Sequence, residues 1–195
     1  MLKEKLKDYN IILASGSPRR QAFFKELDVN YTIKVREIEE TYPPHLQAGE
    51  ITDYLAQLKA SAFTDLAEKD ILITSDTIVW HNGQAIGKPK DFENAKKMLE
   101  SLSGQKHEVI TSVSFTSKYF QKTVHDTTKV WFKKLMPEEV DYYLKTYKPF
   151  DKAGSYGIQE WIGYIGVEKI EGCYFNVMGL PTRLVYETLT QLVKP

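Results

Sequence analysis

Apolar and polar residues follow two different rhythms along this chain, and each rhythm predicts one kind of element. Short apolar runs of strand length stand at residues 11–14 and 71–80, and alternating residues at 109–115 and 124–132 have the period of half-buried strands. A weaker run at 32–36 predicts one more strand. Between these runs, apolar residues recur at the spacing of amphipathic helices. Strands that alternate with helices favour an α/β fold.

Five segments carry the helical spacing, at 19–27, 52–66 and 91–102 and in two stretches that begin at Pro137 and Pro181. Proline suits the first position of a helix, where no N–H is needed. In the third segment Asp91 is a favoured N-cap, and Gly104 follows as a stop signal. In the first segment we expect Ala22, Phe23, Phe24 and Leu27 to face the core.

The dipeptide Asn82-Gly83 separates two strand-like runs and is the strongest short signal for a β-hairpin. A two-residue loop at this place, with its pairing extended along both strands, sets Thr77 opposite Lys88 on one face of the sheet. Asp76, one residue earlier, then lies on the other face unless a β-bulge intervenes. The register therefore brings Asp76 and Lys88 together only at a strand end or through a bulge.

Asp76 interrupts the apolar run at 71–80, where an ionised carboxylate is costly unless a cation, a metal or water receives it. We therefore rank a functional Asp76 above an aspartate that merely ends a strand. Lys59 lies on the apolar stripe of its helix and either points its ammonium into a cleft or, as is commoner, extends it to solvent. Glu40 belongs to the acidic run 37–40, which is usually a solvated face, so it is a weak metal ligand candidate.

The residues Ser15, Ser17, Arg19 and Arg20 belong to a turn between the first buried strand and a helix. Ser17 is a favoured N-cap, and the free N–H groups of the first helical turn can bind an anion. Two arginines at the positive end of a helix dipole are unfavourable unless an anion such as phosphate offsets them. From these residues alone, phosphate binding and a solvated arginine pair bridged to acids such as Glu26 fit equally well.

Six of the eleven glycines fall between residues 154 and 179. Residues 152–159 read as a buried strand beside glycines that allow a close backbone approach. Gln159 carries a donor and an acceptor on one amide and could read the edge of a base, although such an amide is more often part of a strand surface. Residues 176–181 read as a loop that leads into the last helix. The four histidines form no cluster in the sequence, and we interpret them as structural or solvent-facing: His45, His81, His107 and His125.

Composition narrows the function classes. The chain has 195 residues, 26 Lys and Arg, and 26 Asp and Glu, which gives a net charge of zero. Such a balance argues against a protein that grips DNA or RNA, but it leaves a nucleotide ligand open. The single Cys173 excludes an intrachain disulfide. The sequence shows no repeat, linker, signal peptide or membrane span, so we expect one domain over residues 1–195 and a cytoplasmic protein without a membrane partner.

Taken together, several motifs resemble the Maf family of nucleoside triphosphate pyrophosphatases. The match runs in order over nearly the whole chain. The matching segments are LASGSPRR at 13–20, SDT at 75–77, GKP at 87–89, LSG at 102–104 with HEV at 107–109, KAGSYGIQ at 152–159 and NVMGLP at 176–181.

The resemblance implies an α/β fold of two lobes, with a long twisted mixed sheet and a central cleft, similar to inosine triphosphate pyrophosphatases. It implies hydrolysis of a nucleoside triphosphate between the α and β phosphorus atoms, with a divalent cation such as Mg²⁺ or Mn²⁺. By motif, Asp76 is the proton acceptor. We expect Asp76, with Glu40 as the weaker candidate, to bind the cation. The resemblance implies phosphate contacts by Arg19, Arg20, Lys59 and Lys88. The full set of expected substrate-binding residues is Ser15, Ser17, Arg19, Arg20, Lys59, Thr77, Lys88 and Gln159.

Arg19, Thr77 and Gln159 resemble the set that marks the branch acting on dTTP and UTP. One departure bears on the base: many relatives have Gly after this glutamine, whereas this chain has Glu160. Two alternatives stay open, namely a pyrophosphatase for another modified nucleotide such as 7-methyl-GTP, and a non-catalytic nucleotide-binding regulator of cell division. A homodimer is the expected assembly from general base rates.

Overall fold

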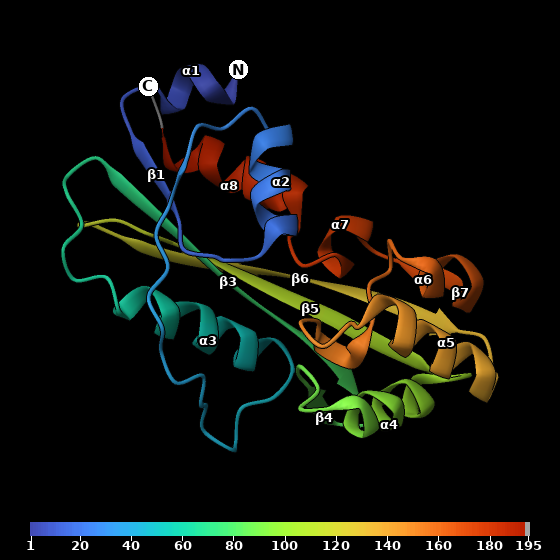
Figure 1. Cartoon of the computed structure of the whole chain (residues 1–195). Helices are drawn as coiled ribbons and strands as arrows, with labels where there is room; N and C mark the ends of the chain where they lie inside the picture. The colour runs from blue at the N-terminus through green and yellow to red at the C-terminus, as the bar shows by residue number, and fades with distance from the viewer. Residues whose placement is uncertain (194–195) are drawn as a thin grey trace. The chain divides into compact units, whose positions relative to one another are not determined.

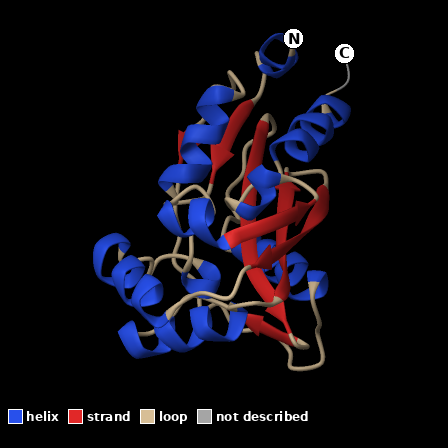
Figure 2. Ribbon diagram, turned by 90° about the vertical axis from the view of Figure 1, so that its right-hand side faces the viewer, coloured by secondary structure: helices blue, strands red, loops and turns tan. Residues whose placement is uncertain are grey.

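Helices and strands alternate along residues 1–193, the part of the chain that the computed structural model describes (Figure 1). Figure 2 distinguishes the helices, strands and loops of the same residues. The elements are α1 (Leu2–Leu6), β1 (Asn10–Leu13), α2 (Pro18–Glu26), β2 (Thr32–Ile33), α3 (Gly49–Ser61), β3 (Asp70–His81), β4 (Gln84–Ile86), α4 (Phe92–Leu102), β5 (Lys106–Thr116), β6 (Gln121–Phe132), α5 (Pro137–Tyr147), the 3₁₀ helix η1 (Ala153–Ser155), α6 (Trp161–Gly166), β7 (Val167–Glu171), α7 (Tyr174–Val177) and α8 (Thr182–Leu192).

Within the described residues, seven strands pair in the order β2-β1-β3-β5-β6-β7, with β4 on β3. β1 is parallel to both of its neighbours, whereas β4 and β7 are antiparallel to theirs. The mixed sheet with interleaved helices confirms the predicted α/β class. No helix within residues 1–193 has the length and apolar content needed to cross a membrane.

The chain divides into two compact units. Unit 1 consists of Met1–Asp76, Thr111–Asp126 and the described part of Gly179–Pro195, and unit 2 consists of Thr77–Ile110 and Thr127–Met178. The strands β3, β5 and β6 each contribute residues to both units. The predicted single domain ends at residue 195, and its last two residues lie outside the described part of the chain.

Unit 1 is built around β1, which carries the register Ile12↔Thr32 on one side and Ile12↔Leu72 on the other. Ile12 and Leu72 pack with Ala60 of α3 and with Phe63 in one apolar cluster. Figure 1 shows α1 beside α8, and the two helices are in contact. Because β1 ends at Leu13 inside this core, the turn that follows it starts from a rigid strand.

Three sequence predictions for unit 1 need correction. Ala22 is exposed, because the buried face of α2 is made by Phe23 and Phe24. The helix predicted at 52–66 is the earlier α3, and Phe63 is buried although it lies beyond the helix end. The strand predicted at 32–36 is reduced to β2, where only two residues pair with β1.

The β3–β4 hairpin of unit 2 follows the predicted register for three pairs. Trp80 lies opposite Ala85, and both loop residues, Asn82 and Gly83, have positive φ angles of 50° and 74°, as the turn of a two-residue hairpin requires. The pairing stops where β4 ends, so the extrapolated pair of Thr77 with Lys88 is wrong. Just beyond β4, the carbonyl of residue 87 accepts a hydrogen bond from the N–H of residue 154 at 3.0 Å and not from β3.

The core of unit 2 gathers around β3, α4 and α5, and it includes Val79, Leu99 and Tyr143. The predicted cap of α4 is confirmed, since the Asp91 carboxylate accepts from the Asn94 N–H at 2.8 Å. The strand predicted at 152–159 is wrong, because this segment forms η1 and irregular backbone.

Gly154 explains the absence of a strand there. Its φ of 67° is incompatible with an extended chain, and a Cβ at this position would lie 2.7 Å from Cγ2 of Val79. The glycine therefore permits both a left-handed conformation and a close approach to β3.

Candidate functional site

The first part of the candidate site along the chain is the turn between β1 and α2. Ser17 is the N-cap residue of α2 and Pro18 its first helical residue, as predicted. The Ser17 N–H donates to Oγ of Ser15 at 3.2 Å, which tightens the turn. Within residues 1–193 the Ser17 side chain makes no capping hydrogen bond. The first N–H groups of α2 lack partners inside the helix, so this turn is suited to bind an anion.

Arg20 is held in place by two backbone carbonyls. Its Nε donates to the Gly179 carbonyl at 2.9 Å, and its Nη1 donates to the Ser75 carbonyl at 3.0 Å. Burial lowers the pKa of Arg20, while the nearby Asp76 carboxylate opposes this decrease and Arg19 adds to it. The guanidinium remains charged because its ordinary pKa is far above neutral. Arg20 is therefore a fixed cation close to Asp76.

Lys59 and Asp76 form a largely buried ion pair. The Lys59 Nζ lies 2.6 Å from Oδ1 of Asp76 and 3.3 Å from Oε1 of Glu40. The side chain of Asp76 is 9% exposed and that of Lys59 is 19% exposed, whereas Glu40 is 49% exposed. The structure thus places the Lys59 ammonium on Asp76 and not in solvent, and it gives the buried carboxylate the cation that its apolar strand requires.

Hydroxyl groups hold the helix that carries Lys59. Thr74 of β3 donates to the Ala56 carbonyl in α3 at 2.7 Å. Ser112 of β5 lies 2.6 Å from both the Thr52 hydroxyl and the Asp53 carboxylate on the same helix. Buried hydroxyls need such partners, and here the partners are on α3. These bonds fix α3 against β5 and against β3, the strand that carries Asp76.

The cluster carries more positive than negative groups. Arg19, Arg20 and Lys59 supply three cations, and Asp76 and Glu40 supply two carboxylates. Partly buried charges of this kind interact more strongly than they would in water. A polyphosphate, which is anionic along its length, matches this arrangement.

Glu40 and Asp76 fit a divalent cation. Both carboxylates contact the same Lys59 ammonium, so they lie within reach of one cation. Carboxylate oxygens are ligands that Mg²⁺ and Mn²⁺ prefer, and Mg²⁺ is commonly held by one or two carboxylates together with substrate phosphates. Within residues 1–193 no group of three or more His, Cys, Asp and Glu side chains is arranged for a metal.

The remaining predicted contacts belong to unit 2. Thr77 directly follows Asp76 in β3, and Lys88 lies just beyond the end of β4. Gln159 follows η1, and its buried Oε1 has no hydrogen-bond partner within residues 1–193. A buried acceptor without a partner is uncommon in folded proteins.

Sequence reasoning missed the role of Ser75. Its backbone carbonyl accepts from Arg20 and lies 3.4 Å from Nζ of Lys59, so it holds both cations beside Asp76. Its Oγ is buried without a hydrogen-bond partner in the described chain. Every residue has a backbone carbonyl, so the identity of a residue does not predict such a contact. The position of Ser75 next to Asp76 is the one signal that the sequence offers.

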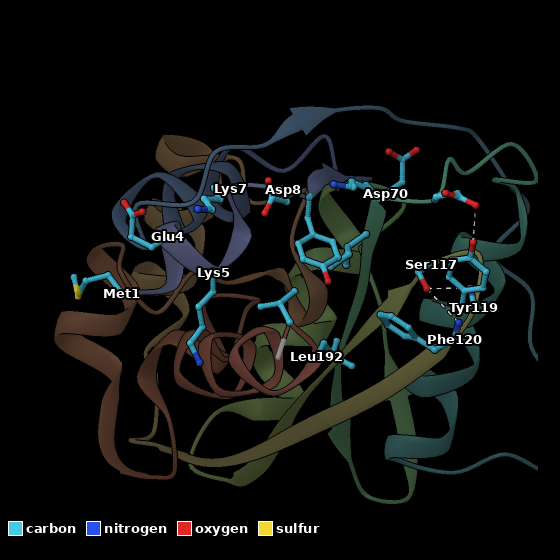
Figure 3. A pocket seen from close by; sticks show the side chains of 15 residues that line it. Met1, Glu4, Lys5, Lys7, Asp8, Asp70, Ser117, Tyr119, Phe120 and Leu192 are labelled. Carbon is cyan, nitrogen blue, oxygen red and sulfur yellow. Dashed lines mark hydrogen bonds between the residues drawn. The ribbon is translucent and has the colours of Figure 1, made fainter. Parts of the chain in front are cut away.

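Unit 1 also contains a pocket of about 770 Å³ that is separate from the predicted site residues (Figure 3). Its walls come from α1, the start of β3, the turn after β5 and the end of α8. Tyr119 donates to Glu68 at its rim. None of the residues predicted for substrate or metal lines it.

Comparison of the sequence with known proteins identifies the family of this chain. The model of the family described as Maf-like protein matches residues 10–192. A protein of Flavobacterium johnsoniae named dTTP/UTP pyrophosphatase is 60% identical over 194 residues, which cover 99% of this chain and 100% of that protein. A protein of Christiangramia forsetii with the same name is 57% identical over 194 residues, 99% of each chain.

A solved structure supports the fold. The Ham1 protein of Staphylococcus aureus superposes with a TM-score of 0.52 over 94% of this chain and 99% of that chain, at 16% sequence identity. At this identity the likeness concerns the fold alone, and it agrees with the fold predicted from the motifs. Because the family model spans nearly the whole sequence and the relatives match from end to end, the chain belongs to the Maf family.

Proposed function

We propose that this protein hydrolyses dTTP and UTP to the nucleoside monophosphate and pyrophosphate. The observation that carries the proposal is the buried carboxylate of Asp76, held by Lys59 and close to Arg20. A cation-rich cluster around a buried acid is an arrangement suited to phosphoanhydride hydrolysis. The names of the two relatives described above support the choice of nucleotide.

The triphosphate tail binds to the β1–α2 turn in this proposal. Ser15 and Ser17 contact its oxygens together with the N–H groups of α2, and Arg19, Arg20 and Lys88 neutralise its charge. Arg20 is fixed by two carbonyls before any ligand arrives. Such preorganisation is favourable because the group need not be ordered again during the reaction.

Asp76 acts as the proton acceptor. A water molecule loses a proton to the Asp76 carboxylate, and its oxygen forms a bond to the α phosphorus. The bond from that phosphorus to the bridging oxygen breaks, and pyrophosphate leaves. Lys59 occupies Asp76 without substrate. When a triphosphate competes for its ammonium, the carboxylate oxygen becomes available to the water.

Glu40 and Asp76 would hold a divalent cation, Mg²⁺ or Mn²⁺, together with oxygens of the substrate. When bound, such a cation neutralises charge on the phosphates and acidifies a nearby water. This matters because a carboxylate with an ordinary pKa is a modest base at neutral pH. The exposure of Glu40 allows its side chain to reorient toward the cation.

Arg19, Thr77 and Gln159 select the base in this proposal. The buried Oε1 of Gln159 without a partner in the described chain supports a role in binding a donor on the ligand. The N3–H group of uracil and thymine is such a donor.

We also propose that residues 1–195 act as one domain, that the protein works in the cytoplasm, and that it binds neither nucleic acid nor membrane. The zero net charge supports the absence of a nucleic-acid partner. A homodimer is the proposed assembly, and sedimentation of the purified protein tests it.

A panel of nucleoside triphosphates tests the reaction. The purified protein is incubated with each triphosphate and Mg²⁺ or Mn²⁺, and the monophosphate and pyrophosphate are quantified separately from free phosphate. We expect equal amounts of UMP and pyrophosphate from UTP, and the corresponding products from dTTP. Release of free phosphate with a diphosphate product, or preference for 7-methyl-GTP, would contradict the proposal.

A further inference from the structure

A buried polar network fixes the side chain of Glu160, the residue directly after Gln159. Its Oε2 accepts a hydrogen bond from the hydroxyl of Tyr143, and its Oε1 lies 3.1 Å from Nζ of Lys152. The Tyr143 oxygen in turn accepts from the Gly157 N–H at 3.0 Å. Tyr143 is fully buried, and the side chains of Lys152 and Glu160 are 10% and 18% exposed. Contacts on both oxygens hold the Glu160 carboxylate in one orientation.

The carboxylate of Glu160 and the amide of Gln159 both approach Gly157. A Cβ on Gly157 would lie 2.8 Å from Cδ of Glu160 and 3.0 Å from Nε2 of Gln159. The two side chains therefore pack against the same glycine. A carboxylate attracts the amide N–H groups and repels the amide oxygen, so the charge of Glu160 favours the orientation in which Nε2 is on this side.

This orientation determines which atom of Gln159 is left for a ligand. Its Oε1 is buried and has no hydrogen-bond partner within residues 1–193. Uracil and thymine carry a hydrogen on N3, which can donate to this oxygen, whereas N3 of cytosine has a lone pair that it repels. If the amide turned by half a rotation, Nε2 would take the place of Oε1 and would suit cytosine instead.

We propose that Glu160 is a positioning residue that determines base specificity, because its carboxylate holds the Gln159 amide with the oxygen toward the base. The protein then prefers uracil and thymine nucleotides to cytosine nucleotides. This inference rests on the proposed function, in which Gln159 contacts the base. It also gives a purpose to a charged residue that the family resemblance left unexplained.

The substitution Glu160→Gln tests the inference, since it removes the charge and keeps the shape. Pyrophosphate release is measured with UTP and with CTP, and kcat and KM are determined for each. We expect the ratio of kcat/KM for UTP over CTP to fall about tenfold, the factor that one hydrogen bond contributes. The change resides in KM, because the triphosphate and its reacting atoms are bound elsewhere, and kcat for UTP stays close to the wild-type value.

Glu168→Gln is the matched control, because Glu168 is an exposed glutamate of β7 in the same unit. It should leave the ratio unchanged. A ratio in Glu160→Gln equal to that of an active wild-type protein overturns the inference and leaves the proposed function intact. If the wild-type protein releases no pyrophosphate from UTP or dTTP, the proposed function fails, and the inference fails with it.

If Glu160→Gln shows no cooperative unfolding transition, and so is not properly folded, Tyr143→Phe is used as the test variant instead. This variant keeps the carboxylate but removes one of its two anchors. We expect the UTP-to-CTP ratio to fall in the same direction by a smaller factor. An unchanged ratio in this folded variant also overturns the inference.

Discussion

Asp76 and Lys59 show how a single charge in an apolar strand signals a site. The sequence identified Asp76 because a buried carboxylate requires a partner, and the structure supplies Lys59 at 2.6 Å. The sequence left the direction of Lys59 open, since a lysine on an apolar stripe usually extends to solvent. Only the packing of α3, fixed by hydroxyl contacts such as that of Thr74, decides where its ammonium lies.

The first prediction concerns Asp76→Asn. We expect pyrophosphate release from UTP to fall by about 10²–10⁴-fold, because the amide cannot accept the proton from water. Affinity for the triphosphate should persist, since Arg19, Arg20 and Lys59 remain. Turnover by quenched-flow or steady-state assay and binding by calorimetry separate the two effects.

Asp141→Asn is the control for this variant, because it removes the carboxylate of another Lys–Asp pair, the one with Lys96 at 2.7 Å. Its turnover should match the wild-type value. Near-normal turnover of Asp76→Asn would remove Asp76 from the role of proton acceptor.

The second prediction concerns pH and His107. This side chain is 1% exposed, and burial, with a smaller contribution from His81, lowers its pKa from 6.5 to about 3. The folded protein therefore holds it neutral, while the unfolded chain binds a proton below pH 6.5. The stabilising effect of the neutral form is complete above pH 6.5 and is lost progressively as the pH falls toward 3, by about 1.4 kcal/mol per pH unit.

Urea unfolding at pH 6 and pH 4 measures this effect. The variant His107→Gln keeps a polar group near the Tyr156 hydroxyl, which lies 2.7 Å from Nε2 of the histidine, but it cannot take up the proton. The free energy of unfolding should therefore decrease less in the variant than in the wild-type protein over this range. Equal decreases would mean that His107 is protonated in both states.

At the scale of elements, the sequence correctly predicted turns and helix caps, whose formation depends on a few neighbouring residues. The Asn82-Gly83 turn and the Asp91 cap are both present, because each depends on a few neighbouring residues. The segment around Gly154 was predicted as a strand because its residues are apolar and small. Its actual conformation depends on contact with Val79 of β3, which is distant in the sequence.

The third prediction tests that contact. Gly154→Ala should lower the free energy of unfolding by about 2 kcal/mol or more, because the new Cβ meets Cγ2 of Val79 at 2.7 Å and the positive φ disfavours any side chain. Gly87→Ala is the matched control, since a Cβ there meets no atom within 4 Å and its φ is not in the left-handed range. Chemical denaturation of both variants gives the comparison, and equal stabilities would show that the β3 contact yields at little cost.

At the scale of the molecule, the sequence predicted the class of fold but not the order of strands. Alternating helices and strands indicated α/β, and the motifs indicated the family. The pairing of β1 with both β2 and β3, and the position of β5 next to β3, follow from contacts between residues far apart in the chain. For the same reason the motifs suggested Arg20 as a site residue, but the carbonyls that hold it could not be foreseen.

The fourth prediction is that a triphosphate stabilises the whole molecule. At a concentration of UTP one hundred times its Kd, binding should add about 2.7 kcal/mol, which corresponds to a rise in Tm of roughly 5–10 °C for a chain of this size. The Asp76→Asn variant is used with Mg²⁺ so that UTP is not consumed, and Tm is read by calorimetry. UMP lacks the β and γ phosphates and, at the same concentration as UTP, should give a smaller rise in Tm. An equal rise would show that the cationic cluster does not bind the tail.

The bond between Arg20 and the Gly179 carbonyl joins residues 159 positions apart. During translation, the first turn leaves the ribosome long before residue 179 is synthesised. The hydrogen bond from Arg20 to the Gly179 carbonyl can therefore form only after most of the chain has emerged. A nascent or prematurely terminated chain that lacks this segment would present an arginine with only one of its two backbone anchors. Arg20 therefore gains its second backbone anchor only after residue 179 has been added, so a chain that ends before this residue should hold the guanidinium less firmly.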